Sequence, residues 1–405
     1  MIMYAADSKF GHIGYVVIDR VPVGNPIAIG GVRMRKGLTL EEIVDLAREM
    51  TLKFAFLNIP VGGAKAGVLW KPLSSPEERK EYFTAFGRSI SPLLKKGLYC
   101  AGEDLGVNSV DIYHIKKGAG VKTHIPSTSK GISGYYTGLS VYICTEQLLS
   151  SLGMEIKGAR VAIEGFGKVG TSAARLFYNA GAKVVAVSTV KGGIYNPQGL
   201  DIDKIVAIAE ARGDDVVKEY TEAEQISSDG LLDIDVDVLA PCAGPYSITK
   251  ENLHRLKAKM VVPGANIPVT SEAELLLYER GIHCMPAFVS SCGGILAYAL
   301  IEHGFHGVEL DSIMREGFGK RVCRLIEKAQ KESLSLSQAA RETAERSIAN
   351  NYMIDDNRQK SNRNDLLWKL YKKSRRARAG FLLKSFATSY MTEELLKDSP
   401  GWTKL

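Results

Sequence analysis

The segment that most constrains the fold is residues 159–189, ARVAIEGFGKVGTSAARLFYNAGAKVVAVST. It predicts a strand over residues 161–164, a glycine-rich turn, a helix closed by Gly181 and a second strand over residues 183–188. Glycines in such a turn allow a close backbone approach to a pyrophosphate at the helix N-terminus. The glycines with the required spacing are Gly165, Gly167 and Gly170. We therefore expect a domain that binds a nicotinamide or flavin dinucleotide; the alternative is a Rossmann-like domain with an empty crevice.

Two lysines that precede this unit have unusual settings. A capping-box pattern, Thr39 with Glu42, predicts the start of a helix over residues 39–57, and Lys53 lies at the edge of its apolar stripe. Lys65 follows in a stretch that its glycines mark as a loop. An ammonium among apolar neighbours is costly unless an anion meets it. The pair therefore predicts a site for a small carboxylate and a second amine of lowered pKa, the alternative being a snorkelling helix lysine and an ordinary turn lysine.

Length and composition restrict the class of protein. A chain of 405 residues, 45% hydrophobic and 24% charged, is typical of a soluble enzyme of two domains. The first residues lack the basic start and apolar run of a signal peptide, and no apolar stretch reaches the length of a membrane span. The six cysteines show no metal-ligand spacing. We expect a cytoplasmic protein with reduced thiols, no metal site and no cysteine nucleophile.

The order of patterns along the chain predicts an α/β protein. Residues 11–33 indicate two neighbouring strands, a second helix is expected over 76–96, and residues 129–138 are rich enough in Gly and Ser to form a hinge. Strands and helices then alternate, as in a doubly wound parallel sheet, and the pattern is helical from about residue 295. The expected parts are a substrate-binding and oligomerisation domain over 1–133, a dinucleotide-binding Rossmann domain over 134–340, and a helical C-terminal segment over 341–405 that packs back on the first domain.

A basic stretch near the end of the chain needs a separate interpretation. Residues 358–384 hold ten Lys or Arg against one acid, Asp365. No aromatic-interleaved or groove-reading motif accompanies them. We therefore expect a solvated helical face or a subunit contact rather than nucleic-acid binding.

Several spaced motifs then occur in a fixed order. They run from Gly30-Gly31-Val32-Arg33 through MTLK, VGGAKAG, GEDLGV, GFGKVG, APCA, GAN and CGG to AARETAERSI at 339–348. With these motifs in this order, the chain resembles the Glu/Leu/Phe/Val amino-acid dehydrogenase family over nearly its whole length. The resemblance implies reversible, NAD(P)-dependent oxidative deamination of an L-amino acid to the 2-oxo acid and ammonia. It also implies a homo-oligomer, either a hexamer or an octamer.

The resemblance assigns roles that such a reaction needs: a cation for the α-carboxylate, a near-neutral amine to activate water, and a carboxyl group to move protons. Lys53 would bind the α-carboxylate, Lys65 would be the catalytic lysine and Asp104 the proton-transfer acid. Thr137 would touch the nicotinamide amide, and Asn266 would lie near the nicotinamide ribose.

Other family positions bear on the substrate. Glutamate-specific members hold the distal carboxylate with a lysine just before the GGxR motif and a serine in the helix after NAGG, and here Ile29 and Tyr298 occupy those positions, with Gly31 beside the substrate. A distal carboxylate would be buried without a partner, so an apolar side chain is expected and the leucine branch is the closest in look. The family's PDxxxNAGG has Ala287 for the Asp and Ser291 for the Asn, and its usual EGAN is PGAN here. These departures leave glutamate, bound by another anion ligand, as an alternative.

The cofactor positions implied by the turn and the resemblance include Lys168, Val169 and Ala243 beside the three glycines. No acid follows the second strand, where Ser188 and Thr189 stand with Lys191 two residues on. An acid there would bind the ribose 2′-hydroxyl and repel a 2′-phosphate. We therefore expect NADP or NAD, with a slight lean to NADP.

One rival function of another class stays open. A non-catalytic homologue would use the cofactor domain as a sensor and the basic stretch as a binding segment. Another Rossmann enzyme, such as a tetrahydrofolate dehydrogenase, fits poorly because it leaves the pair of Lys53 and Lys65 without a purpose.

Overall fold

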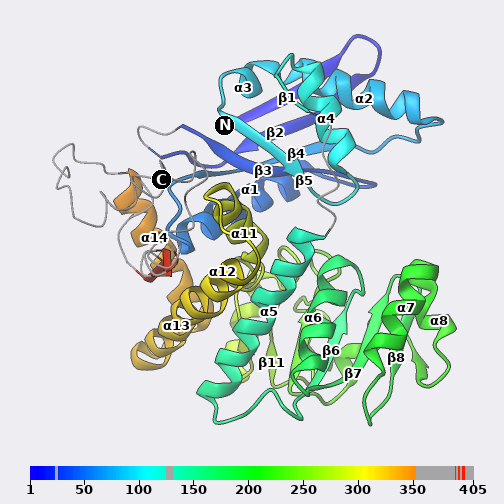
Figure 1. The fold of residues 1–405 in the computed structure, drawn as a ribbon, viewed down its shortest axis with the longest axis vertical. Coiled ribbons are helices and arrows are strands. Elements are labelled where there is room, and N and C mark those ends of the chain that lie inside the picture. Colours follow the sequence, from blue (N-terminus) through cyan, green and yellow to red (C-terminus); the bar gives the residue numbers. More distant parts are fainter. Residues whose placement is uncertain (23–25, 125–130, 353–387, 389–390, 393–394, 397–405) are drawn as a thin grey trace. The chain divides into compact units, whose positions relative to one another are not determined.

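The computed structural model describes the chain except residues 23–25, 125–130, 353–387, 389–390, 393–394 and 397–405 (Figure 1). The chain divides into two compact units. Unit 1 contains Met1–Lys130 and the part of the last long helix from Ala344 on, and unit 2 contains Gly131–Thr343. The basic stretch at 358–384 lies outside the described residues.

Unit 1 is built on a mixed sheet. Among its described residues the strand order is β1-β2-β4-β3-β5; β2 pairs antiparallel with β1 and β4, and β3 pairs parallel with β4 and β5. The expectation that β2 and β3 are neighbours is wrong, because β4 lies between them. Parallel strands need a crossover, and helix α1 supplies it between β3 and β4. The strands are β1 (Ile2–Asp7), β2 (Gly11–Ile18), β3 (Ala28–Arg35), β4 (Gly62–Leu69) and β5 (Tyr99–Glu103).

Helices cover both faces of this sheet, with α1 on one face and α2, α3 and α4 on the other (Figure 1). The helix expected over 76–96 is broken at Ile90. Pro92 explains the break, since proline lacks an N–H and is tolerated in a first helical turn but not in an interior. The helices are α1 (Leu40–Phe56), α2 (Pro76–Ser89), α3 (Ser91–Lys95) and α4 (Ser109–Gly118).

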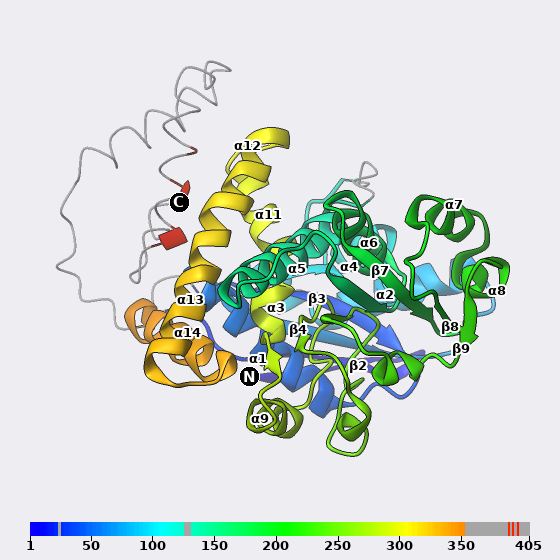
Figure 2. The same cartoon turned by 90° about the horizontal axis from the view of Figure 1, so that it is seen from below.

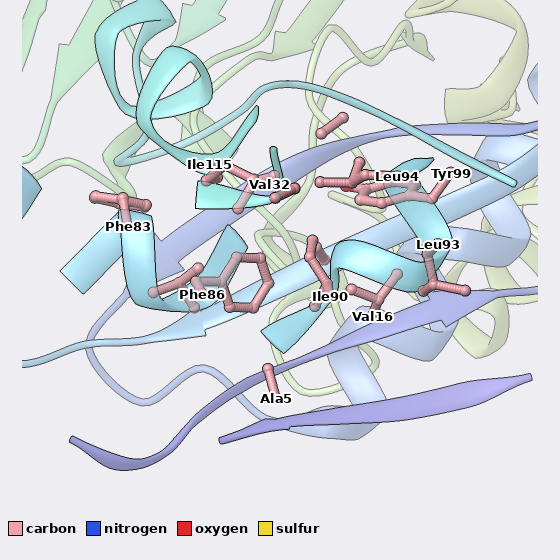
Figure 3. Packing of buried hydrophobic residues seen from close by; sticks show 14 of the residues in the cluster. Ala5, Val16, Val32, Phe83, Phe86, Ile90, Leu93, Leu94, Tyr99 and Ile115 are labelled. Carbon is pink, nitrogen blue, oxygen red and sulfur yellow. The ribbon is translucent and has the colours of Figure 1, made fainter. Parts of the chain in front are cut away.

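The core of unit 1 lies between the sheet and helices α2 to α4. Phe83 and Phe86 of α2 are fully buried and pack with Ile90, Leu93 and strand residues such as Val16 (Figure 3). At about 25 cal/mol per Å² of buried apolar surface, the burial of these side chains stabilises unit 1. The core thus fixes β3, β4 and β5, the strands that carry the candidate site.

Unit 2 is built on a mostly parallel sheet. Among its described residues the order is β12-β11-β10-β6-β7-β8-β9, parallel from β12 to β7 and antiparallel at β8 and β9. The strand, turn, helix and strand expected over 159–189 are confirmed as β6, α6 and β7. The strands are β6 (Arg160–Glu164), β7 (Lys183–Thr189), β8 (Gly192–Tyr195), β9 (Glu224–Ile226), β10 (Val238–Pro241), β11 (Met260–Val261) and β12 (His283–Cys284).

The helices of unit 2 begin with α5, which packs against α6, α11 and α13 (Figure 2). The expectation of a hinge over residues 129–138 is wrong for most of its length, because α5 starts at Ile132. The helical pattern expected from residue 295 is confirmed as far as the described residues reach. The helices are α5 (Ile132–Ser151), α6 (Lys168–Asn179), α7 (Ile202–Arg212), α8 (Val216–Glu219), α9 (Ser271–Glu279), α10 (Ala287–Ser290), α11 (Gly293–Glu302), α12 (Gly307–Ser312), α13 (Gly319–Glu332) and α14 (Leu336–Tyr352), with 3₁₀ turns at η1 (Gly213–Asp215), η2 (Gly230–Asp233) and η3 (Leu253–Arg255) and a π-helical stretch, η4 (Ile313–Phe318).

Candidate active site

Lys65 does not lie in a loop. It is a residue of β4, where it pairs with Val17 of β2, and its side chain is only 3% exposed. The preceding glycines serve packing between elements: a Cβ at Gly63 would lie 2.1 Å from the backbone nitrogen of Thr51 in α1. The expectation of a glycine loop is therefore wrong: Gly62 and Gly63 lie in β4, where Gly63 lets helix α1 approach the strand and Gly62 lies against the backbone of Arg20.

Asp104 meets Lys65 directly. The segment after β5 places the Asp104 carboxylate so that Oδ2 lies 2.7 Å from the Lys65 Nζ. The same carboxylate accepts hydrogen bonds from Arg33 of β3, at 2.8 Å from Nε to Oδ2 and 3.4 Å from Nη2 to Oδ1. One acid thus receives two cations from two neighbouring strands.

Glu42 extends this group of charges into helix α1. Its side chain, 4% exposed, accepts a hydrogen bond from Arg33 Nη1 at 3.0 Å and also contacts Arg35. The Thr39 hydroxyl accepts from the Glu42 backbone N–H, so the predicted helix start is confirmed. The main contacts of the Glu42 carboxylate are with the two arginines and not with the backbone at the start of the helix.

The electrostatics of the group follow from its burial. Burial lowers the pKa of Lys65 below its ordinary value, against the opposing charge of Asp104, and the nearby Arg33 lowers it further. For Asp104, burial alone would raise the pKa, but the charges and hydrogen bonds of Lys65 and Arg33 lower it well below its ordinary value. Asp104 is therefore a carboxylate at neutral pH, and Lys65 is an amine that gives up its proton more easily than a surface lysine.

The remaining candidate substrate residues of unit 1 lie on α1 and β3. Lys53 is buried at 4% exposure near the end of α1. Gly31 pairs with Gly102 of β5, and a Cβ at Gly31 would lie 2.8 Å from the Asp104 Cβ, so glycine permits the close approach of these two segments. Ile29 is half-buried on the same strand, paired with Gly63 and Cys100.

Unit 2 brings the candidate cofactor residues together around the turn after β6. Helix α6 starts at Lys168 with Gly167 as its N-cap, and no side chain caps its first N–H groups. A Cβ at Gly167 would meet no atom within 4 Å, so the backbone there faces open space. Unsatisfied N–H groups at a helix N-terminus attract a phosphate. The turn therefore fits a dinucleotide pyrophosphate.

The other segments expected at the cofactor contact the same turn. A Cβ at Gly165 would lie 2.6 Å from the Ala243 Cα, and one at Gly264 would lie 2.9 Å from a Val169 methyl carbon. The loop that leads to Asn266 thus packs on the start of α6. The backbone N–H of Gly165 also donates to the Ser188 carbonyl at 3.0 Å.

The end of β7 shows how Thr189 is used. Its hydroxyl donates to the Asp214 carbonyl at 2.8 Å and accepts from the Lys191 backbone N–H at 3.1 Å. The Thr189 side chain is thus engaged within the protein. Among the described residues, no ion pair is formed by the exposed Lys191 ammonium.

Thr137 lies on α5, which packs closely on α11, and Ser291 lies between α10 and α11. A Cβ at Gly294 of α11 would lie 2.9 Å from the Thr137 Oγ1 of α5. The Ser140 hydroxyl lies 2.6 Å from the Ser290 carbonyl, which fixes the end of α10 and the adjacent, buried Ser291. Tyr298 lies on α11, one turn after Gly294, and is 47% exposed.

Two groups of charged residues were missed by sequence reasoning. Arg33 was noted as part of a motif and Glu42 as a cap, but neither was expected at the site. The signal for Arg33 is a charged side chain in a predicted strand, flanked by the apolar residues Val32 and Met34. Glu164, directly before the glycine turn, was also missed; burial raises its pKa to about 6.

Two parts of this chain match the models of known protein families. Residues 131–358 match the model of the Glutamate/Leucine/Phenylalanine/Valine dehydrogenase family, and residues 22–119 match the Glu/Leu/Phe/Val dehydrogenase dimerisation domain. The chain belongs to this family. It is therefore an amino-acid dehydrogenase by family, an oxidoreductase of CH–NH₂ groups with NAD or NADP.

Named relatives support the same class. The chain is 36% identical over 302 residues to a glutamate dehydrogenase of Thermotoga maritima, covering 70% of this chain and 72% of that protein. It is 35% identical over 278 residues to an NAD-specific glutamate dehydrogenase of Staphylococcus aureus, covering 66% of each. The family membership therefore does not depend on the cofactor domain alone.

Solved structures show the same fold. A hetero-hexameric glutamate dehydrogenase from Thermus thermophilus, in its leucine-bound form, matches with a TM-score of 0.71 and 27% identity over 86% of this chain and 87% of that one. An L-tryptophan dehydrogenase from Nostoc punctiforme matches in fold with a TM-score of 0.61 and 22% identity over 87% and 96%. The dimerisation domain and the hexameric relative support an oligomer.

The described residues contain no group of three or more His, Cys, Asp and Glu side chains that could hold a metal ion. None of their helices is long and apolar enough to cross a membrane.

The glycines of the turn give a first prediction. A Cβ at Gly170 would lie 1.9 Å from the Gly165 carbonyl oxygen, so Gly170→Ala should lower the free energy of unfolding by about 1–3 kcal/mol. Gly167→Ala is the matched control: it should change that free energy by less than about 0.5 kcal/mol but weaken dinucleotide binding. Urea unfolding and cofactor titration measure both; equal destabilisation by the two variants would contradict this account of the turn.

Proposed function

We propose that this protein catalyses the NAD(P)-dependent oxidative deamination of an L-amino acid with an apolar side chain, and the reverse reductive amination. The observation that carries the proposal is the contact of Lys65 with Asp104 at 2.7 Å inside unit 1 of a chain that belongs to an amino-acid dehydrogenase family. Bound nicotinamide would supply the hydride acceptor. Gly165, Gly167, Gly170 and the first N–H groups of α6 would hold its pyrophosphate.

The residues of unit 1 suit the remaining steps. Lys53 would bind the α-carboxylate as a buried cation, which compensates its own desolvation. Lys65, with its lowered pKa, would remove a proton from the water that attacks the substrate iminium. Asp104, whose carboxylate lies 2.7 Å from the Lys65 Nζ, would take part in moving protons to and from the substrate. Thr137 and Asn266 would position the nicotinamide.

The apolar preference rests on Ile29. A glutamate side chain that reached this half-buried position would bring a carboxylate to a residue with no charge. An unpartnered buried carboxylate costs several kcal/mol, or about two orders of magnitude in specificity. Ser291 and Tyr298 are further candidates for contact with the substrate side chain. The leucine branch, to which the sequence motifs look closest, has this preference.

Glutamate is the second candidate substrate. The relatives that match at 35% and 36% identity are glutamate dehydrogenases. This alternative requires a different cation for the distal carboxylate. A homologue that binds cofactor but lacks activity is a third case, which reduction of cofactor by any amino acid would exclude.

We propose that NADP is accepted, with a slight preference over NAD. Thr189 brings no negative charge to the end of β7, and its hydroxyl is engaged by the protein. Lys191, exposed two residues later, could meet a 2′-phosphate with a charge-assisted hydrogen bond of about 1.5–3 kcal/mol. The NAD-specific relative from Staphylococcus aureus is the argument for the opposite preference.

Removal of the catalytic amine is the direct test of the proposal. Lys65→Ala should lower turnover by about a hundredfold to ten-thousandfold, because the general base is lost, while the fold and cofactor binding persist. Lys71→Ala is a suitable control, since Lys71 belongs to the same unit but is 44% exposed. Steady-state kinetics with circular dichroism check both variants. A Lys65→Ala enzyme as active as the wild type would end the assignment.

Substrate preference can be reversed at one position. Wild-type protein screened against the twenty amino acids should use branched or aromatic ones about tenfold or more better than glutamate. Ile29→Lys should raise kcat/KM for glutamate relative to leucine, because it supplies the missing cation. Ile27→Lys, an exposed position just before the same strand, should leave the ratio unchanged. Glutamate as the best wild-type substrate would overturn the preference.

Cofactor preference is tested by binding. Dissociation constants for NADPH and NADH, measured at one ionic strength, should slightly favour NADPH, and Lys191→Ala should weaken NADPH binding by about tenfold without affecting NADH. Tenfold tighter NADH binding by the wild type would contradict the preference. An unchanged ratio in the variant would contradict the role of Lys191.

A further inference from the structure

The charges around Lys65 include more cations than the pair itself needs. Asp104 carries one negative charge but contacts both Lys65 and Arg33. Arg33 is 5% exposed and is held on its other side by Glu42. The burial of an arginine between two acids costs desolvation free energy. Neither the binding of an α-carboxylate nor the proton transfer requires this arginine.

We propose that Arg33 is a positioning residue that keeps Asp104 ionised and lets Lys65 give up its proton, and that Glu42 holds Arg33 in place for this role. The proposal deepens the function proposed above and rests on it. Arg33 acts through Asp104 and Lys65, so it is not assigned a contact with substrate.

The geometry supports this division of labour. A lone pair of Lys65 and Asp104 would resist deprotonation of the lysine, because the loss of its charge would leave a buried carboxylate uncompensated. Arg33 donates to both Asp104 oxygens, so the carboxylate stays compensated when Lys65 is neutral. Since arginine is always protonated in proteins, its compensation does not change across the working pH range.

Among the described residues, the charged and titratable groups shown to act on Lys65 and Asp104 are in unit 1. Asp104 contacts both Lys65 and Arg33. Arg33 lowers the pKa of Lys65, and Glu42 raises it. The charge of Asp104 also acts on Tyr99 of β5. Burial raises the pKa of Tyr99, so the Tyr99 side chain stays neutral. The net effect of Arg33 on Lys65 is therefore a repulsion that favours the neutral amine.

Arg35 provides a matched control. It lies two residues along the same strand and contacts the same Glu42, but it has no contact with Asp104 within the described residues. It is also 33% exposed, so its loss should disturb the site less. A purely structural role of the arginines would make the two positions similar, whereas the proposal makes them different.

The experiment measures the titration of Lys65 itself. Trace acetic anhydride reacts with neutral amines, and peptide mass spectrometry reports the acetylated fraction of Lys65 from pH 6 to 11. In Arg33→Gln the midpoint should rise by about one pH unit relative to wild type, because the repelling charge is gone. In Arg35→Gln it should stay where it is. In Arg33→Lys, which keeps a charge but not the two-oxygen contact, it should rise by a smaller amount.

The same variants are compared in oxidative deamination. The acidic limb of kcat/KM against pH should move upward with the labelling midpoint in Arg33→Gln and stay fixed in Arg35→Gln. If Arg33→Gln does not fold, the midpoint of Arg33→Lys decides. A Lys65 midpoint that is unchanged or lowered in the folded Arg33 variants, or raised equally in Arg35→Gln, would overturn the proposal. Labelling that shifts as expected in a protein that oxidises no amino acid would instead reject the proposed function and retain the role of Arg33.

Discussion

The buried carboxylate of Asp104 is the group on which the candidate site depends. A charge at this depth persists only with partners, and the fold brings Lys65 from β4 and Arg33 from β3 to the same two oxygens. Each of those cations is in turn buried and needs the acid. The strand order of unit 1, with β3 between β4 and β5, is what makes these contacts possible.

Glycine residues make this arrangement sterically possible in both units. In unit 1, Gly31 lets the segment with Asp104 approach β3, and Gly63 lets α1 approach β4. In unit 2, Gly170 lets α6 start directly against the turn at Gly165. In each case the missing Cβ would meet backbone, which cannot move as a flexible side chain can. The glycines therefore fix distances between elements as much as they free the backbone for a ligand.

Local patterns were sufficient for the dinucleotide unit and insufficient for unit 1. The turn at Gly165 and the helix cap at Thr39 depend on neighbours in sequence, so both were predicted. The place of β4 between β2 and β3, and hence Lys65 in a strand, depends on pairing between distant segments, which the periodicity of one segment does not contain. The same is true of Arg33 and Glu42, whose partners lie 71 and 9 residues away.

The distribution of departures from the family pattern separates chemistry from specificity. Lys53, Lys65 and Asp104 stand at the positions to which the family resemblance assigns the reaction, and Lys65 and Asp104 belong to one charge network with Arg33. Ala287 and Ser291, by contrast, lie in unit 2, in or beside the short helix α10. An α-carboxylate is common to every amino acid, so a cation that binds this group cannot choose among side chains. Under the proposed function, the choice among side chains would fall to uncharged positions such as Ile29.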